Sequence, residues 1–202
     1  LAGAAAATPY RLVAAGDLPW RVAVIGHTGR GGYGHGLDEM WRSVPGCEVV
    51  GVADADPAGL AATCRKLGGV PGFPDYRVML RDVKPDIVAV GPRHIDQHHD
   101  MCLEAVAAGA RGIYIEKPFC RTPREADGIV AACAQARVPV RLAVAHRNRY
   151  HPVLPVIRKL LDDGQLGSVL ELRGRGKEDH RGGALDAWVL GTHVFDLAAW
   201  IA

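Results

Sequence analysis

Five short runs rich in β-branched and small apolar residues recur along the chain, and they constrain its fold more than any other feature. They are VAVIG at 22–26, EVVGVAD at 48–54, DIVAVG at 86–91, GIYIE at 112–116 and VRLAVAH at 140–146. Amphipathic stretches separate them, which is typical of βαβ units. Because runs that are apolar throughout fit strands covered on both faces, we predict an α/β fold with a doubly wound parallel sheet.

Capping residues mark where the helices between these runs begin and end. Thr122, Pro123 and Glu125 provide an N-cap, a first-turn proline and the glutamate of a capping box. Glycine is the usual left-handed residue just after a helix. The same reasoning predicts helices from Asp56 to the Gly68–Gly69 pair, from about Asp96 to Gly109, over about 153–163 and from about Thr192.

Composition and charge exclude several classes of protein. The 202 residues are 49% hydrophobic and 23% charged, which is typical of a globular protein. Since domains commonly have about 100 to 150 residues, the length allows one large domain or one and a half smaller ones. The net charge is only +2. We therefore expect neither a nucleic acid nor a membrane surface as partner, and no run approaches the roughly 20 apolar residues of a membrane span.

The cysteines and the ends of the chain bear on its compartment. Five cysteines without a CxxC pair indicate reduced thiols, which favours a cytoplasmic protein. Residues 1–19 are alanine-rich and form either a flexible tail or the remnant of a signal peptide, with a cleavage site at Ala5–Ala7; the second alternative implies export. Because the chain starts at Leu1 and stops within the apolar AAWIA, we expect a fragment of a longer protein.

A glycine-rich loop, GHTGRGGYG at 26–34, directly follows the first predicted strand and precedes LDEMWRSV, which we expect to be helical. Glycines at such a turn let the backbone approach a pyrophosphate, whose charge is stabilised at the helix N-terminus. A GxGxxG frame counted from Gly26 has Thr28 at its second glycine, whereas the frame from Gly29 begins too late for the strand. We prefer the first frame. It predicts a Rossmann-type dinucleotide site formed by Gly26, Thr28, Gly29, Arg30 and Gly31.

Asp54 ends the second predicted strand, where a carboxylate can accept hydrogen bonds from the adenosine ribose. Its negative charge would repel a 2′-phosphate, and the next residues include no arginine. We therefore expect NAD rather than NADP. A cap or loop role for Asp54 is the alternative.

The alternation of strands and helices stops after His146. A helix, a strand over SVLELRGRG at 168–176, a Gly-rich loop and a last helix are expected instead. We place a domain boundary near residues 147–151. The predicted organisation is a tail at 1–19, a nucleotide-binding Rossmann domain at 20–147 and a second domain beginning at 148–202.

Glu116-Lys117-Pro118 ends the fifth run and is followed by FCRTPREAD. Together with the glycine loop, Asp54 and the later GTHVFDL, it resembles the Gfo/Idh/MocA family of sugar and cyclitol oxidoreductases over roughly residues 21–202. The resemblance implies a Rossmann domain followed by a larger α/β domain, only part of which is present here. It also implies NAD(P)-dependent hydride transfer involving a sugar, cyclitol or related polyol, and association of copies through the sheet of the second domain.

The resemblance also assigns residues. It implies that Lys117 lies beside the nicotinamide and hydrogen-bonds the substrate hydroxyl, and that His193 is the acid/base. Independently, a lysine at the carboxyl end of a parallel strand lies at the edge where ligands bind, and an imidazole suits proton transfer near neutral pH. Further cofactor contacts are expected from Glu116, Pro92 and His98, and substrate contacts from Arg149, Tyr150 and Asp196.

One position departs from the family pattern. Many of these dehydrogenases carry Asp four residues before the histidine, but this chain has Val189, and Asp186 and Lys177 lack the required spacing. Two alternatives therefore stay open: a non-catalytic dinucleotide-binding sensor or partner subunit, and an inactive truncated fragment. His94, His98 and His99 lack the glutamate of a zinc-protease motif, so no metal site is predicted.

Overall fold

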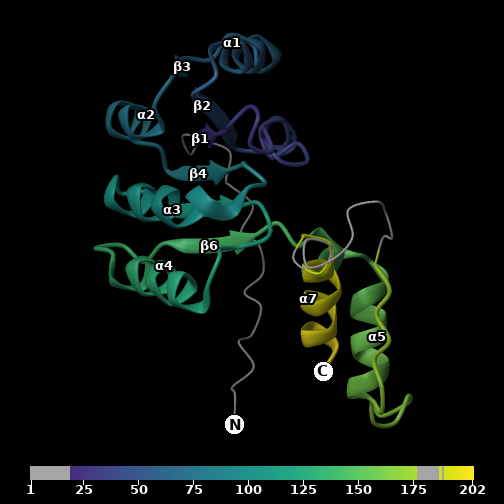
Figure 1. The fold of residues 1–202 in the computed structure, drawn as a ribbon. Coiled ribbons are helices and arrows are strands. Elements are labelled where there is room, and N and C mark those ends of the chain that lie inside the picture. The colour runs from purple at the N-terminus through teal and green to yellow at the C-terminus, as the bar shows by residue number, and fades with distance from the viewer. Residues whose placement is uncertain (1–18, 177–186, 188) are drawn as a thin grey trace.

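The computed structural model describes residues 19–176, 187 and 189–202 (Figure 1). Its centre is a six-stranded sheet in the order β3-β2-β1-β4-β5-β6, and every pair of neighbours is parallel. This order, 321456, is that of the Rossmann fold, so the predicted fold class is confirmed. The strands are β1 (Trp20–Ile25), β2 (Cys47–Ala53), β3 (Gly72–Phe73), β4 (Ile87–Val90), β5 (Gly112–Ile115) and β6 (Arg141–Val144).

Helices connect the strands and two more follow the sheet. Figure 1 shows α2, α3 and α4 stacked along one side of the sheet, with α5 and α7 beyond its β6 side. The α-helices are α1 (Pro57–Lys66), α2 (Tyr76–Val83), α3 (His98–Ala107), α4 (Pro123–Gln135), α5 (Val153–Asp162) and α7 (Gly191–Ile201), and the short 3-10 helices are η1 (Met40–Ser43), η2 (Ile95–Gln97) and η3 (Arg147–Tyr150).

Apolar side chains alternate between the two faces of the sheet. Val22 and Val24 of β1 face one side, where they pack with Trp41, whereas Ala23 and Ile25 face the other. This second face packs on α2, α3 and α4 through Met79, Leu80, Met101, Cys102, Ala105, Ile129 and Cys133, which are all buried. Both faces are therefore covered, as the continuous apolar runs predict.

The predicted helix boundaries are confirmed where caps mark them. Thr122 Oγ1 accepts the backbone N–H of Glu125 at 3.2 Å, although the Glu125 carboxylate accepts from the N–H of Arg121 rather than closing the expected box. Gly109 follows α3 with φ +87°, and Gly164 follows α5 with φ +71°. Glycine adopts this left-handed conformation without a side-chain clash, which ends each helix.

Two predictions are wrong. LDEMWRSV forms turns and the short η1 instead of a regular helix; Gly34 and Gly36, with φ values of +63° and +85°, keep only the residues before it out of a helix. Residues 168–176 form no strand, since no described segment pairs with them. Neither β3 nor α2, whose N-cap is Asp75, is predicted from the sequence. The domain boundary near 147–151 stays a prediction.

The described helices do not include one with the length and hydropathy needed to cross a membrane.

Replacing Thr122 by Ala should lower the free energy of unfolding by about 1 kcal/mol, because the Glu125 N–H loses its acceptor at the start of α4. Urea unfolding followed by circular dichroism measures this change. Thr122→Ser is the control and should retain most of the stability. Equal losses in both variants would show that the cap hydrogen bond is not responsible.

Candidate functional site

The carboxyl ends of the strands meet at one edge of the sheet because the strands are parallel. The ladder of backbone hydrogen bonds continues one residue past four of these strands. The N–H of Gly26 donates to Ala53 O, that of Gly91 to Ile25 O, and that of Glu116 to Val90 O, at 2.8 to 2.9 Å. The N–H of Ala145 donates to Ile115 O in the same way. The glycine loop, the Pro92 segment and the EKP segment therefore begin side by side, at the edge where such sheets bind ligands.

The glycine loop leaves part of its backbone uncovered. Gly29 (φ +83°) and Gly32 (φ +59°) have open space where a Cβ atom would lie. By contrast, a Cβ on Gly31 would lie 2.6 Å from the Arg93 backbone, so this glycine allows the loop to pack on the segment after β4. An exposed, glycine-lined backbone of this kind fits close approach by a phosphate, although no regular helix begins directly behind it.

Thr28 holds the loop on the end of β2. Its N–H lies 3.0 Å from both oxygens of the buried Asp54 carboxylate, and its hydroxyl donates to Asp54 Oδ2 at 2.7 Å. The N–H of Asp56 donates to Asp54 Oδ1. A Cβ on Gly59 would overlap Thr28 Oγ1, so α1 leaves room for this side chain. Asp54 thus orders the loop in this structure, while its contact with a ribose stays a prediction.

Polar contacts also join the glycine loop to the segment after β4. Arg30 forms a 2.5 Å ion pair with Asp96, and His27 Nδ1 lies 2.6 Å from the Gln97 amide oxygen. Arg93 Nε donates to Gly31 O at 3.3 Å. Arg30, which we predicted to contact the cofactor, is therefore engaged with a protein carboxylate.

A cavity of about 310 Å³ opens beside Gly26 and Asp54 at the ends of β1 and β2. Tyr76 and Arg77 of α2 also line this cavity. Arg77 was missed by the sequence analysis because α2 itself was not predicted. Its guanidinium stacks on the Tyr76 ring at 4.5 Å and lies 3.3 Å from Glu104.

His98 is completely buried and bridges two loops of the site. Its Nε2 lies 2.7 Å from Pro92 O, in the segment after β4, and its Nδ1 lies 3.0 Å from Phe119 O, just after the EKP segment. Both partners are carbonyl oxygens, which only accept, so each ring nitrogen of His98 faces a backbone acceptor. Pro92 and His98 are thus brought together as predicted, but the His98 side chain is occupied by the protein.

Glu116 is almost completely buried, and its Oε1 has no hydrogen-bond partner within the described part of the chain. Burial raises its pKa, while the neighbouring Lys117 charge acts in the opposite direction. A Cβ on Gly34 would lie 3.2 Å from the Glu116 side chain, so the glycine loop reaches this carboxyl group. A buried oxygen without a hydrogen-bond partner is typical of a site where a further polar ligand completes the hydrogen bonds. This oxygen lies beside the glycine loop.

Lys117 is 4% exposed, and its Nζ donates to the backbone oxygen of Val189 at 2.9 Å. The contact is to the main chain of Val189, so a neutral carbonyl accepts from the ammonium group at this position. Asp186 and Lys177, the other polar groups considered above, lie outside the described residues.

His193, on the first turn of α7, lies beside His146, the second residue after β6. The two rings meet edge to face with centroids 5.8 Å apart. Burial lowers the pKa of His193, and the charges of Lys117 and Arg147 lower it further, whereas Asp196 acts against them. Lys117 and His193 are therefore brought together as predicted, and His146 is a residue that the sequence analysis did not assign.

Asp196 pairs with Arg149 and not with His193. Arg149 Nε donates to Asp196 Oδ2 at 3.2 Å, and Nη2 contacts Oδ1. The His146 Nδ1 lies 4.0 Å from the same carboxylate. Tyr150 is 69% exposed. The pair links η3 to α7, which positions His193 relative to the end of β6.

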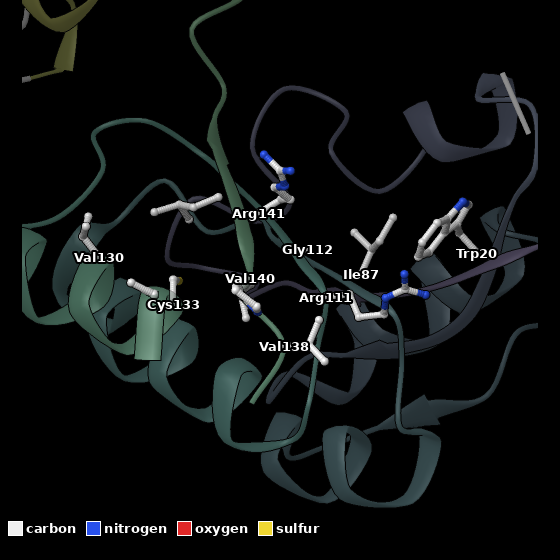
Figure 2. Close-up of a pocket in the computed structure, with 12 residues that line it drawn as sticks. Trp20, Ile87, Arg111, Gly112, Val130, Cys133, Val138, Val140 and Arg141 are labelled. Carbon is white, nitrogen blue, oxygen red and sulfur yellow. The ribbon is translucent and has the colours of Figure 1, made fainter. Parts of the chain in front are cut away.

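A larger cavity lies at the opposite edge of the sheet. Figure 2 shows it between the amino ends of β4, β5 and β6, where Trp20, Arg111 and Val138 contribute to a mainly apolar wall. Its volume is about 940 Å³, but none of the predicted site residues lines it.

Within residues 19–176, 187 and 189–202 no cluster of side chains suited to a metal ion occurs. Burial raises the pKa of Cys120, which disfavours a nucleophilic role.

Comparison with known families agrees with this arrangement. The family described as "Oxidoreductase family, NAD-binding Rossmann fold" (GFO_IDH_MocA) matches residues 20–146. The chain belongs to the Gfo/Idh/MocA family. This confirms the resemblance noted in the sequence, and the NAD-binding Rossmann domain is the part of the family that the match covers.

Gfo/Idh/MocA relatives include sugar and inositol dehydrogenases. D-apiose dehydrogenase of Paraburkholderia graminis is 32% identical over 129 residues, covering 63% of this chain and 33% of that protein. Inositol 2-dehydrogenase of Corynebacterium glutamicum is 25% identical over 186 residues, covering 90% and 54%. The chain thus spans between a third and about half of the length of these relatives.

A solved Gfo/Idh/MocA structure matches beyond the Rossmann domain. Myo-inositol dehydrogenase from Lactobacillus casei, in complex with NAD(H) and myo-inositol, superposes with a TM-score of 0.76 at 26% identity. The match covers 91% of this chain and 54% of that one. The likeness therefore includes the β6–α5 region as well as the sheet.

Replacing His98 by Asn should lower the free energy of unfolding by about 2–3 kcal/mol, because one short side chain cannot satisfy both the Pro92 and Phe119 carbonyls. Urea unfolding measures the loss, and NADH fluorescence titration should show weaker binding because both loops shift.

His99→Asn is the matched control for this change, since the neighbouring imidazole is partly exposed and pairs with Asp100. It should change neither property appreciably. Full stability and NADH affinity in His98→Asn would contradict the bridging role.

Proposed function

We propose that this chain is an NAD-dependent oxidoreductase that transfers a hydride between the nicotinamide and a carbinol carbon of a sugar, cyclitol or related polyol. The observation that carries the proposal is the convergence of the buried Lys117 and the half-buried His193 at the carboxyl edge of the sheet, next to a glycine loop with open backbone. Membership of the Gfo/Idh/MocA family supports it.

The residues present fit the dinucleotide. The glycine loop from Gly26 to Gly31 would hold the pyrophosphate, and the 310 Å³ cavity beside Asp54 would hold the adenosine. The Pro92 segment and Glu116, whose Oε1 has no partner within the described residues, would lie toward the nicotinamide end. The buried negative charge of Asp54 favours NAD over NADP, because it repels a 2′-phosphate. NAD, when bound, supplies the acceptor for the hydride that leaves the carbinol carbon.

Lys117 and His193 have separate tasks in this proposal. The Lys117 ammonium would donate a hydrogen bond to the oxygen of the reacting hydroxyl. It would stabilise the negative charge that forms on this oxygen as the hydroxyl loses its proton. His193 would accept that proton, which requires a neutral imidazole. Burial and the neighbouring positive charges lower its pKa and so favour the neutral form. The ion pair of Arg149 and Asp196 would position α7. Arg149, Tyr150 and Asp196 are also the proposed substrate contacts.

A non-catalytic dinucleotide-binding sensor is the second candidate. Val189 favours it, because the resemblance implies an aspartate carboxylate at this position in many family dehydrogenases, and valine has none. Such a protein would bind NADH but turn over no polyol. Fluorescence titration with NADH, followed by absorbance assays of NAD reduction with a panel of sugars and cyclitols, separates the two candidates.

Replacing Lys117 by Met should reduce turnover by about 10²–10⁴-fold, because the reacting hydroxyl loses its hydrogen-bond donor. NADH affinity should change by less than about threefold, since the glycine loop is untouched. Steady-state kinetics and NADH titration measure the two quantities. Wild-type turnover in a folded Lys117→Met variant would overturn the assignment.

The pH dependence of kcat/KM should have its acidic midpoint below 6.5, the ordinary imidazole pKa, because His193 must be neutral to accept the proton and its pKa is lowered. Activity would therefore be fully present above this midpoint and lost as the pH falls through it. His193→Asn should abolish most activity and remove this limb from what remains. A midpoint above 6.5, or an unchanged limb in the variant, would contradict the role.

A further inference from the structure

A second imidazole lies beside the proposed acid/base and has no assigned role. His146 is two residues past the last residue of β6, so it leaves the sheet at the same edge as Lys117. Its ring meets that of His193 at an angle of 85°, with the centroids 5.8 Å apart. Because the two rings are nearly perpendicular, their nitrogens lie in different planes. The two imidazoles can therefore bind two different atoms of one small ligand.

Both imidazoles contain a buried nitrogen that lacks a hydrogen-bond partner among the residues whose structure is described. These are the Nδ1 atoms of His146 and His193. The Asp196 carboxylate is 4.0 Å from the His146 Nδ1, which is beyond hydrogen-bond distance. An unpaired buried nitrogen is costly, so two of them on rings whose centroids lie 5.8 Å apart indicate a place where a polar ligand completes the hydrogen bonds.

The groups around His146 favour its neutral form. Burial lowers its pKa, and the positive charges of Arg149 and Lys117 also lower it, while Asp196 acts in the opposite direction. Asp196 is itself paired with Arg149, and this pairing reduces the effect of its negative charge on the pKa of His146. A neutral imidazole can donate from one nitrogen and accept at the other, as a hydroxyl partner requires.

We propose that His146 is a second substrate-binding residue, which hydrogen-bonds the hydroxyl on the carbon next to the one that is oxidised. Oxidation of one carbinol releases one proton, so a single base, His193, suffices for the reaction. The neighbouring imidazole must then meet a different atom. In a sugar or cyclitol the adjacent carbons carry hydroxyls, and the site would therefore select vicinal diols. This inference rests on the proposed function.

The test uses the full chain and one substrate identified from the polyol panel, together with its two deoxy analogues that lack either hydroxyl next to the oxidised carbon. His146→Phe retains the ring packing against His193 but removes both nitrogens, whereas His146→Asn retains a hydrogen-bonding group. His151→Asn is the matched control, because it removes an exposed imidazole from the same segment. Thermal unfolding establishes that each variant is folded.

The wild type should lose about tenfold or more in kcat/KM on one of the two analogues, as expected for a lost buried hydrogen bond. His146→Phe should lose a similar factor on the complete substrate, mainly through KM, and little more on that analogue. His146→Asn should recover part of the loss, and His151→Asn should match the wild type.

Two other outcomes are distinguishable. If His146→Phe changes kcat/KM by the same factor on the substrate and both analogues, or not at all, His146 does not bind the vicinal hydroxyl and the inference is wrong while the proposed function stands. If the wild type binds NADH but oxidises none of the polyols, the proposed function fails and the inference fails with it.

Discussion

The site depends on hydrogen bonds that continue the parallel ladder beyond the ends of the strands. Gly26, Gly91, Glu116 and Ala145 each donate a backbone N–H to the neighbouring strand. The first residues of four loops are thereby held at one level. Because a parallel sheet directs all its carboxyl ends to the same edge, segments far apart in sequence form one surface. Neither the glycine loop nor the EKP segment could form this surface alone.

Side-chain contacts then fix the loops relative to one another. Thr28 attaches the glycine loop to the end of β2 through Asp54, and His98 joins the Pro92 segment to the residue after the EKP proline. Asp54 and His98 are buried, so their hydrogen bonds are stronger and more costly to break than exposed ones. They hold the backbone in place before any ligand binds, and binding then costs less ordering.

Much of the fold is predictable from local sequence because the relevant forces are local. Five of the six strands follow from apolar runs, and Thr122, Gly109 and Gly164 mark helix ends through cap hydrogen bonds and left-handed backbone. The two failures have a different origin. The sequence predicts a helix over LDEMWRSV because it follows the glycine loop, but the chain forms turns and η1 there, and the positive φ values of Gly34 and Gly36 keep the residues before it out of a helix. SVLELRGRG has the composition of a strand, yet a strand forms only with a partner.

The sequence by itself determined the strand–loop–helix alternation, the glycine loop and the types of side chain at the site, because periodicity, capping and glycine conformation act over a few residues. Only the tertiary structure decided which groups meet. It brought His146 beside His193, engaged Asp196 with Arg149, and set the Val189 carbonyl against Lys117. These partners come from different elements, and their distances depend on how α7 and η3 pack at the end of β6. No spacing along the chain contains that information.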